Sequence, residues 1–188
     1  MGNSIPTRTL VAVPYDQMVR NLFKPMESAA ATVLHAAVGI AGESAELIVA
    51  NSIENVVEEM GDIEFYIEAA FQATGGRNFE ELIVPGSDMA QNQVLSTVTI
   101  AIASSAGRLL DYAKKSWVYN QELNLNAFRY ELLRLELMLE TLRDLVGVRR
   151  PDVLRSNQAK LGKRYPEGVY TDAAAQERAD KPGESDVD

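Results

Sequence analysis

Apolar residues recur every three or four positions along most of this chain, as they do in amphipathic helices. The pattern predicts helices over residues 15–23, 28–50, 53–73, 94–117, 125–146 and 151–161. In the second of these, the stripe predicted to face the core is Leu34, Val38, Ala41, Ala45 and Ile48. In the third, it is Val56, Met60, Ile63, Ile67 and Phe71. In the fifth, Leu132, Leu135, Leu139 and Leu142 lie in register. The sequence therefore predicts an all-α protein, a bundle of four to six helices.

Local signals set the ends of these helices. Asn51 and Ser52 are good N-cap residues, and the two glycines of Thr74-Gly-Gly-Arg77 end the helix that follows. Residues 75–92 are typical of a loop. The range from 94 begins with Val-Leu-Ser-Thr-Val-Thr-Ile, which suits a strand by propensity, but its length without a breaker favours a helix. We expect an N-terminal segment with a short helix over 1–27, one all-α domain over 28–170 and a flexible acidic tail over 171–188.

Composition limits the possible functions. The chain has 188 residues, 46% of them hydrophobic, which is enough for one domain with a sizeable core. It contains no cysteine, which excludes disulfides and thiol nucleophiles and fits a cytoplasmic location. No apolar run is long enough for a membrane span, so we expect no membrane partner. The net charge of −9 argues against nucleic acid as a partner, although metal ions and a few basic residues would still permit a nucleotide.

Four carboxylates stand in two matched pairs, Glu43-Ser-Ala-Glu46 and Glu59-Met-Gly-Asp62. Residues three apart share a helix face, so two neighbouring helices would bring all four carboxylates into one patch. The four carboxylates of such a patch would repel one another unless a cation bound between them. Oxygen-only ligands of this kind suit Mg²⁺ or Mn²⁺. The alternative for any single pair is ordinary solvated helix surface.

A faint internal repeat is present. Ala41-Gly-Glu43-Ser-Ala-Glu46-Leu can be laid on Ala106-Gly-Arg108-Leu-Leu-Asp111-Tyr, and each segment is followed by a turn and a second amphipathic helix. Arg108 stands where Glu43 stands, so the metal pattern is lost in the second copy. Two interpretations remain open, a degenerate duplicate that forms a pseudo-dimer with one working half, and a chance likeness between two helical hairpins.

Three segments together resemble the all-α nucleoside triphosphate pyrophosphohydrolases, the MazG-like superfamily that includes the dimeric dUTPases. His35-Ala-Ala-Val-Gly-Ile-Ala-Gly-Glu43-Ser-Ala-Glu46-Leu is similar to the first metal helix of the family, particularly in its phage branch. Glu58-Glu59-Met-Gly-Asp62-Ile-Glu-Phe-Tyr66 is similar to the second. The C-terminal signature is matched by Asn157-Gln-Ala-Lys160-Leu-Gly-Lys-Arg164-Tyr-Pro-Glu-Gly168. The segments occur in the order of the family and span roughly residues 30–170.

The resemblance implies hydrolysis of a (deoxy)nucleoside triphosphate to the monophosphate and pyrophosphate, with Mg²⁺ as cofactor and Mn²⁺ accepted. The implied catalytic metal ligands are Glu43, Glu46, Glu59 and Asp62. The implied contacts to phosphate or ribose are Asn157, Lys160 and Arg164, for which a helix-end role is the alternative. His35, the one histidine, lies near Glu46 in helical projection and is a further substrate-binding candidate, although a structural role is the commoner one for such a histidine. The general base stays unassigned, with Glu46 as a candidate.

The chain departs from the family at one point. Members often carry a Lys-Lys pair soon after the first E-x-x-E, whereas Ile48-Val-Ala-Asn-Ser52 contains no lysine. Lys114 and Lys115 follow the second copy instead. We expect them to bind substrate if the site is completed across the pseudo-dimer or between chains, and to be surface lysines otherwise.

The phage-like first motif implies nucleotide-pool control, in the host cytoplasm if the protein is viral, with dGTP as the expected substrate. A dUTPase-like activity and a catalytically inactive helical assembly or binding protein are the alternatives. The resemblance further implies a homodimer or homotetramer. A di-iron carboxylate bundle is set aside, because it needs two Glu-x-x-His motifs and this chain has one histidine.

Overall fold

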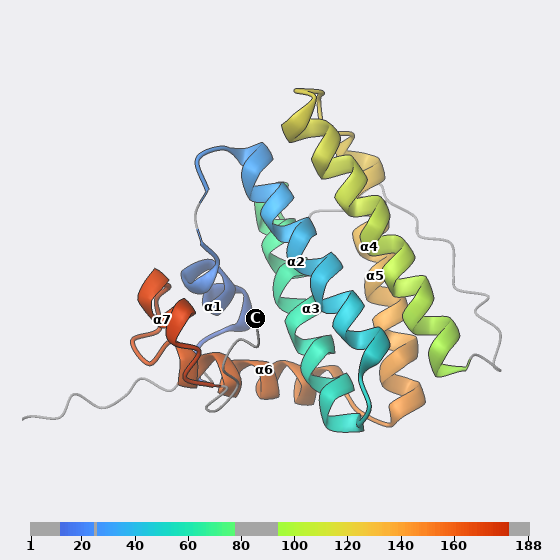
Figure 1. Ribbon diagram of the computed structural model, residues 1–188, viewed down its shortest axis with the longest axis vertical. Helices are drawn as coiled ribbons and strands as arrows, with labels where there is room; N and C mark the ends of the chain where they lie inside the picture. The colour runs from blue at the N-terminus through green and yellow to red at the C-terminus, as the bar shows by residue number, and fades with distance from the viewer. Residues whose placement is uncertain (1–11, 25, 78–93, 181–188) are drawn as a thin grey trace, which may run out of the picture.

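The computed structural model describes residues 12–24, 26–77 and 94–180. Those residues form seven α-helices and no strand, which confirms the predicted all-α class (Figure 1). The prediction of four to six helices did not include the short α7. The helices are α1 (Tyr15–Leu22), α2 (Ala29–Val49), α3 (Ile53–Ala73), α4 (Leu95–Val118), α5 (Leu125–Val146), α6 (Arg150–Arg164) and α7 (Asp172–Glu177).

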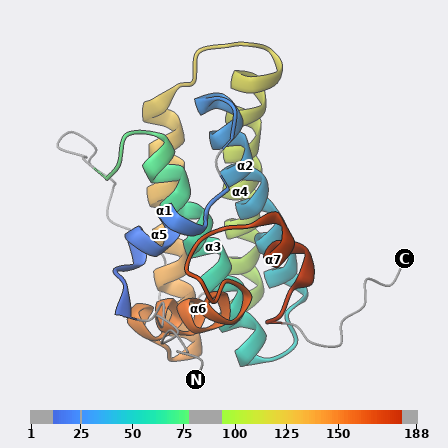
Figure 2. The ribbon, with the colours of Figure 1, turned by 90° about the vertical axis from the view of Figure 1, so that its left-hand side faces the viewer.

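Two antiparallel hairpins make up the body of the bundle. One consists of α2 and α3 and the other of α4 and α5, and the hairpins pack together mainly through α2 and α4 (Figures 1 and 2). Helix α6 crosses the end of the bundle at which α2 ends and α3 begins, and it packs against α3. Helices α1 and α7 lie on the side of α3 and α6, away from the second hairpin.

The ends of the helices follow from their capping residues. The side chains of Ser28 and Ser52 accept hydrogen bonds from backbone N–H groups in the first turns of α2 and α3, each at 3.1 Å. Asn124 does the same for α5 at 3.0 Å, and Gly147 ends that helix in the left-handed conformation with φ of 73°. The predicted limits of α3 and α5 are therefore correct to the residue.

Three expectations need comment. The strand-like sequence after Val94 is helical, as predicted from its length. Helix α6 continues to Arg164, beyond the predicted end at 161. The segment expected to be a flexible tail from residue 171 contains α7, and its Asp180 forms an ion pair with Arg164, so that expectation is corrected over 172–180. Residues 78–93, which include most of the predicted loop, and 181–188 lie outside the described residues.

The predicted buried faces of α3 and α5 are confirmed, but that of α2 is wrong. All five residues of the α3 stripe are at most 5% exposed. In α2, Val38 and Ile48 are about half exposed, at 52% and 48%. The residues that α2 buries are Ala31, Val33, Ala36, Ala37, Ile40, Ser44 and Leu47. The reason is that α2 is apolar around most of its circumference and has α3 and α4 on adjoining sides, so the packing partners rather than the pattern select the face. By length and composition α2 would also pass as a membrane span, a test that core helices of other proteins pass too.

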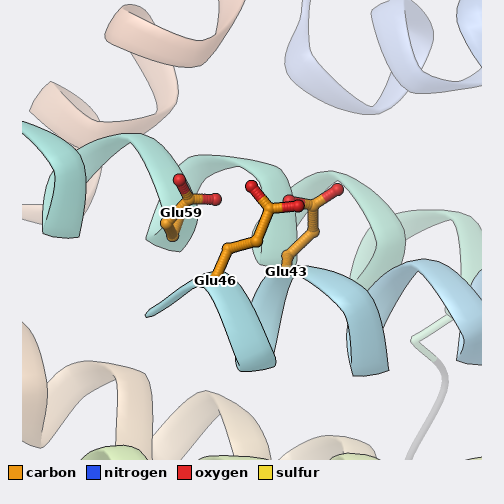
Figure 3. A group of neighbouring side chains, drawn as sticks. All are labelled: Glu43, Glu46 and Glu59. Carbon is orange, nitrogen blue, oxygen red and sulfur yellow. The ribbon is translucent and has the colours of Figure 1, made fainter. Parts of the chain in front are cut away.

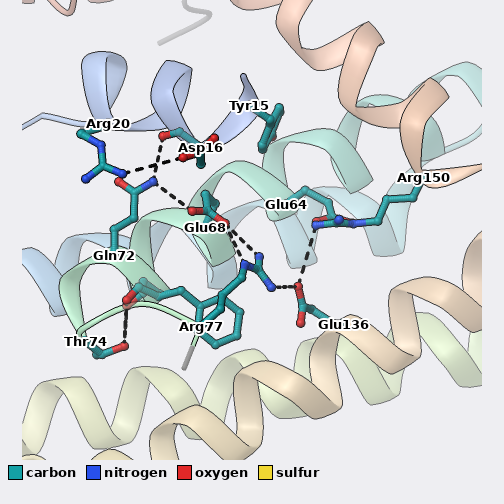
Figure 4. A network of polar contacts seen from close by, with 12 residues as sticks. Tyr15, Asp16, Arg20, Glu64, Glu68, Gln72, Thr74, Arg77, Glu136 and Arg150 are labelled. Carbon is teal, nitrogen blue, oxygen red and sulfur yellow. Dashed lines mark hydrogen bonds and ion pairs between the residues drawn. The ribbon is translucent and has the colours of Figure 1, made fainter. Parts of the chain in front are cut away.

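A buried ionic network holds α3 against α5 and α6 (Figure 4). Glu64 of α3 is 1% exposed and accepts hydrogen bonds from Arg143 at 2.9 Å and from Arg150 at 2.9 and 2.8 Å. Removing one partner of such a pair leaves an uncompensated buried charge. The network therefore fixes where α6 sits relative to the carboxylates of α3.

Candidate functional site

Three of the four predicted metal ligands form one cluster between α2 and α3. Carboxylate oxygens of Glu43, Glu46 and Glu59 lie within 4.8 Å of one another. Glu43 and Glu46 project from α2 toward α3, with Glu46 between Glu43 and Glu59 (Figure 3). The i,i+3 spacing places the first two on one face of α2, and the short connection to α3 brings Glu59 opposite them.

Asp62, the fourth predicted ligand, is held by α6. One of its oxygens accepts a hydrogen bond from Nδ2 of Asn157 at 2.7 Å, and the other pairs with the ammonium of Lys160. The same ammonium also contacts Glu58 at 2.9 Å. Asp62 lines the same pocket as Glu43 and Glu46, but its oxygens are already engaged. The structure therefore divides the predicted ligand set into a cluster of three and a neighbouring ion-paired aspartate.

The glycine of Glu59-Met-Gly-Asp62 is what lets α6 reach Asp62. A Cβ atom on Gly61 would lie 2.9 Å from Cβ of Asn157, which is closer than real Cβ atoms approach. Asn157 is 3% exposed, and its Oδ1 accepts a hydrogen bond from the hydroxyl of Tyr15 at 3.0 Å. The amide orientation is thereby fixed with its donor toward Asp62.

The carboxylates make this region strongly acidic. Burial, together with the charges of Asp62, Glu46 and Glu59, raises the pKa of Glu43 from 4.5 to about 8. Burial and the neighbouring Glu46 raise the pKa of Glu59 as well. Burial also raises the pKa of Asp62, although Lys160 opposes that rise. A cation would favour the ionised forms of all of them, so the donor set fits a hard divalent metal ion.

A pocket of about 280 Å³ opens beside the cluster. Its acidic wall is formed by Glu43, Glu46 and Asp62, and its basic wall by Lys160 and Arg164 of α6. The remaining wall is mainly aromatic and includes Phe23, His35, Phe65, Tyr66, Tyr165 and Tyr170. Charged and aromatic walls facing one pocket suit a ligand that carries phosphates at one end and a flat ring at the other.

His35 belongs to the aromatic wall. Its ring stacks on Phe23 with centroids 4.5 Å apart and meets the edge of Tyr66 at 6.2 Å. Its Nδ1 is buried without a hydrogen-bond partner among the described residues, and burial lowers the pKa of the ring. Tyr66 lies against Gly39, whose Cβ, if present, would be 2.4 Å from the tyrosine ring. The sequence prediction thus placed His35 at the pocket but gave no sign of its aromatic neighbours.

Two predicted substrate contacts lie elsewhere. Lys114 and Lys115 pair with Asp111 at 3.1 and 2.6 Å and do not line this pocket. Because α4 runs antiparallel to α2, its C-terminal turn lies at the opposite end of the bundle from Glu43 (Figure 1). Within one chain these lysines therefore do not complete the site.

Sequence reasoning also missed several residues of the site. Glu58, which is not among the predicted metal ligands, accepts a hydrogen bond from Lys160 at 2.9 Å. Asp180 lies in a segment whose polar composition indicated no structure, yet it pairs with Arg164. Neither contact follows from helical spacing. Glu58 and Lys160 lie 102 positions apart on different helices, and Asp180 lies beyond the end of α7.

In comparisons with protein-family models, curated proteins and solved structures, none matched this chain. The resemblance to the MazG-like superfamily therefore rests on its three motifs and on their arrangement.

Proposed function

We propose that the protein is a Mg²⁺-dependent (deoxy)nucleoside triphosphate pyrophosphohydrolase of the MazG-like type. The proposal depends on one observation. Residues from all three motifs, separated by up to 129 positions, line a single pocket. The first motif contributes His35, Glu43 and Glu46, the second Asp62 and Tyr66, and the third Lys160 and Arg164. Unrelated solvated helix faces have no reason to converge in this way.

The role that we propose for each carboxylate follows from its position. Glu43, Glu46 and Glu59 would hold Mg²⁺, or Mn²⁺ in its place, while Asp62 completes the acidic wall. Bound there, the cation would offset the charge that develops on the phosphates and activate the attacking water. Glu46, the most exposed of the three clustered carboxylates, is the candidate to accept the proton of that water.

The basic wall would position the phosphates and the aromatic wall the base. Arg164 offers a planar fork for a phosphate, and Lys160 contributes a point charge while holding Asp62. We assign contact with the nucleobase to this aromatic wall, which includes Phe23 and Tyr66, with dGTP as the expected substrate. The close approach of Gly39 to Tyr66 holds the tyrosine ring in that wall.

We also propose that the two hairpins are an internal duplication whose second site has lost its metal. Counting from the N-caps Ser52 and Asn124, Glu59 and Glu131 both stand seven residues into their helices. Glu131 is 6% exposed, and it pairs at 2.9 Å with Arg108, the residue aligned with Glu43. An arginine thus supplies, in the second copy, the positive charge that we assign to a metal in the first.

Self-association is part of the proposal. The outer face of α2 exposes Val38, Ile48 and Val49, the last of them 75% exposed. An apolar helix face of this kind is often covered in an oligomer, and a homodimer or homotetramer is the form we expect.

Product analysis with Mg²⁺ and a panel of dNTPs tests the function, with pyrophosphate resolved from orthophosphate. We expect pyrophosphate and the monophosphate, no product in EDTA, and no product from Glu59→Gln in a folded protein. Glu140→Gln, the same change at an exposed position of α5, should retain activity. Turnover by Glu59→Gln would refute the carboxylate site, a strict preference for dUTP would indicate the dUTPase alternative, and absence of turnover with every nucleotide would favour an inactive binding protein.

A further inference from the structure

The C-terminal segment, residues 170–180, closes one side of the pocket. Tyr170, Ala175 and Arg178 line it, and Ala175 belongs to α7, in which no residue is fully buried. At its start the segment is attached to the α1 region by the backbone hydrogen bond from Tyr170 to Asn21 at 3.1 Å. An exposed ion pair between Lys24 and Asp172 adds to this, and exposed pairs contribute little stability.

At the other end, the segment is attached through one buried carboxylate. Asp180 accepts two parallel hydrogen bonds from Arg164, from Nε at 2.5 Å and from Nη2 at 2.6 Å. The side chain of Asp180 is fully covered and that of Arg164 is 20% exposed. This fork-to-fork geometry is the one that arginine also makes with phosphate.

We infer that the carboxylate of Asp180 occupies the phosphate site already proposed at the guanidinium of Arg164 until a phosphate replaces it. This inference rests on the proposed function for the identity of the ligand. Exchange of one oxyanion for another keeps Arg164 paired in both states, so the exchange never leaves a buried guanidinium without a partner. No residue of α7 is fully buried, although Ala174 and Ala175 pack against the core, whereas α6, which carries Arg164, is fixed by the ionic network of Glu64.

Calorimetric titration of the full chain with inorganic tripolyphosphate in Mg²⁺ buffer tests the subsite without requiring turnover. Asp180→Asn should bind tripolyphosphate about tenfold or more tightly than the original chain, because a competing charge-assisted contact is removed. Asp180→Ala also removes the carboxylate, so it should bind tripolyphosphate more tightly as well. Glu177→Gln is the matched control, since it removes the same charge from an exposed position of α7, and its affinity should stay unchanged.

The gain must depend on Arg164. Adding Arg164→Gln to Asp180→Asn should abolish the gain in affinity, and circular dichroism should show that each variant is folded. The inference would be overturned if both Asp180 variants bound tripolyphosphate no more tightly than the original chain, or if the gain in affinity persisted without Arg164. Asp180 would then have a structural role only. Tighter tripolyphosphate binding without hydrolysis of any dNTP would refute the proposed function alone, whereas hydrolysis without a gain in affinity would refute the subsite alone.

Discussion

Replacing Glu43 by Gln should stabilise the metal-free protein at alkaline pH. The pKa of Glu43 is raised from 4.5 to about 8 in the folded state, first by burial and then by Asp62 and the other carboxylates. The folded chain therefore holds this proton more tightly than the unfolded chain does. It follows that the contribution to stability is fully present below pH 4.5 and is lost as pH rises toward 8.

The pKa change sets the size of the effect. At about 1.4 kcal/mol per pH unit, a rise from 4.5 to about 8 corresponds to about 5 kcal/mol of unfolding free energy. Because the side chain is only half-buried, water screens part of the repulsion, and we expect a loss of about 2–5 kcal/mol between pH 5 and pH 9. Glu43→Gln has no proton to lose and should show a flatter dependence.

Urea denaturation in EDTA at a series of pH values measures this directly. The informative quantity is the difference in unfolding free energy between the original chain and Glu43→Gln, because titrating groups away from the carboxylate cluster contribute equally to both. Glu140→Gln, an exposed control, should follow the original chain. Mg²⁺ should raise the stability of the original chain at pH 8 and have less effect on Glu43→Gln. Parallel pH profiles for the two proteins would show that Glu43 does not carry the repulsion we assign to it.

Two further predictions concern packing and the second hairpin. Gly39→Ala should cost about 1–3 kcal/mol of unfolding free energy, because the new methyl group would collide with Tyr66. Gly42→Ala should instead gain about 0.5–1 kcal/mol, since nothing lies within 4 Å of its Cβ position. Arg108→Ala should destabilise by about 1–3 kcal/mol because Glu131 loses its nearest cation, and adding Glu131→Gln should restore most of the loss. Chemical denaturation measures both sets, and equal effects of the two glycine variants, or no rescue in the double variant, would contradict them.

The sequence predicts a helix face well only where the helix has one apolar side. Helices α3 and α5 each have one apolar face and one polar face, and the residues on their buried faces were predicted correctly. Helix α2 is apolar almost all round, so its periodicity is weak, and the predicted face includes the exposed Val38 and Ile48. Which side of such a helix is buried depends on where α3 and α4 pack, and that information lies in the rest of the chain.

The same limit applies to the site. Helical spacing is enough to place Glu43 beside Glu46, because that relation depends on one helix alone. It cannot show that Asp62 is held by Lys160, since this contact joins positions 98 residues apart. The contact requires α6 to pack closely against α3, and Gly61 permits this because it has no side chain. In the sequence alone, a glycine at this position only lowers the helix propensity.

The two hairpins differ in how their buried carboxylates are neutralised. In the second hairpin Arg108 and Arg134 both pair with Glu131, so the charge is balanced by the chain itself. In the first, Lys160 is shared between Asp62 and Glu58, and no cation of the described residues pairs with the three clustered carboxylates at ion-pair distance. Like charges in a half-buried site are costly without a counter-charge. The first hairpin therefore depends on a proton, as the raised pKa of Glu43 indicates, or on a cation from solution, and the competition between these two is what the pH experiment with and without Mg²⁺ measures.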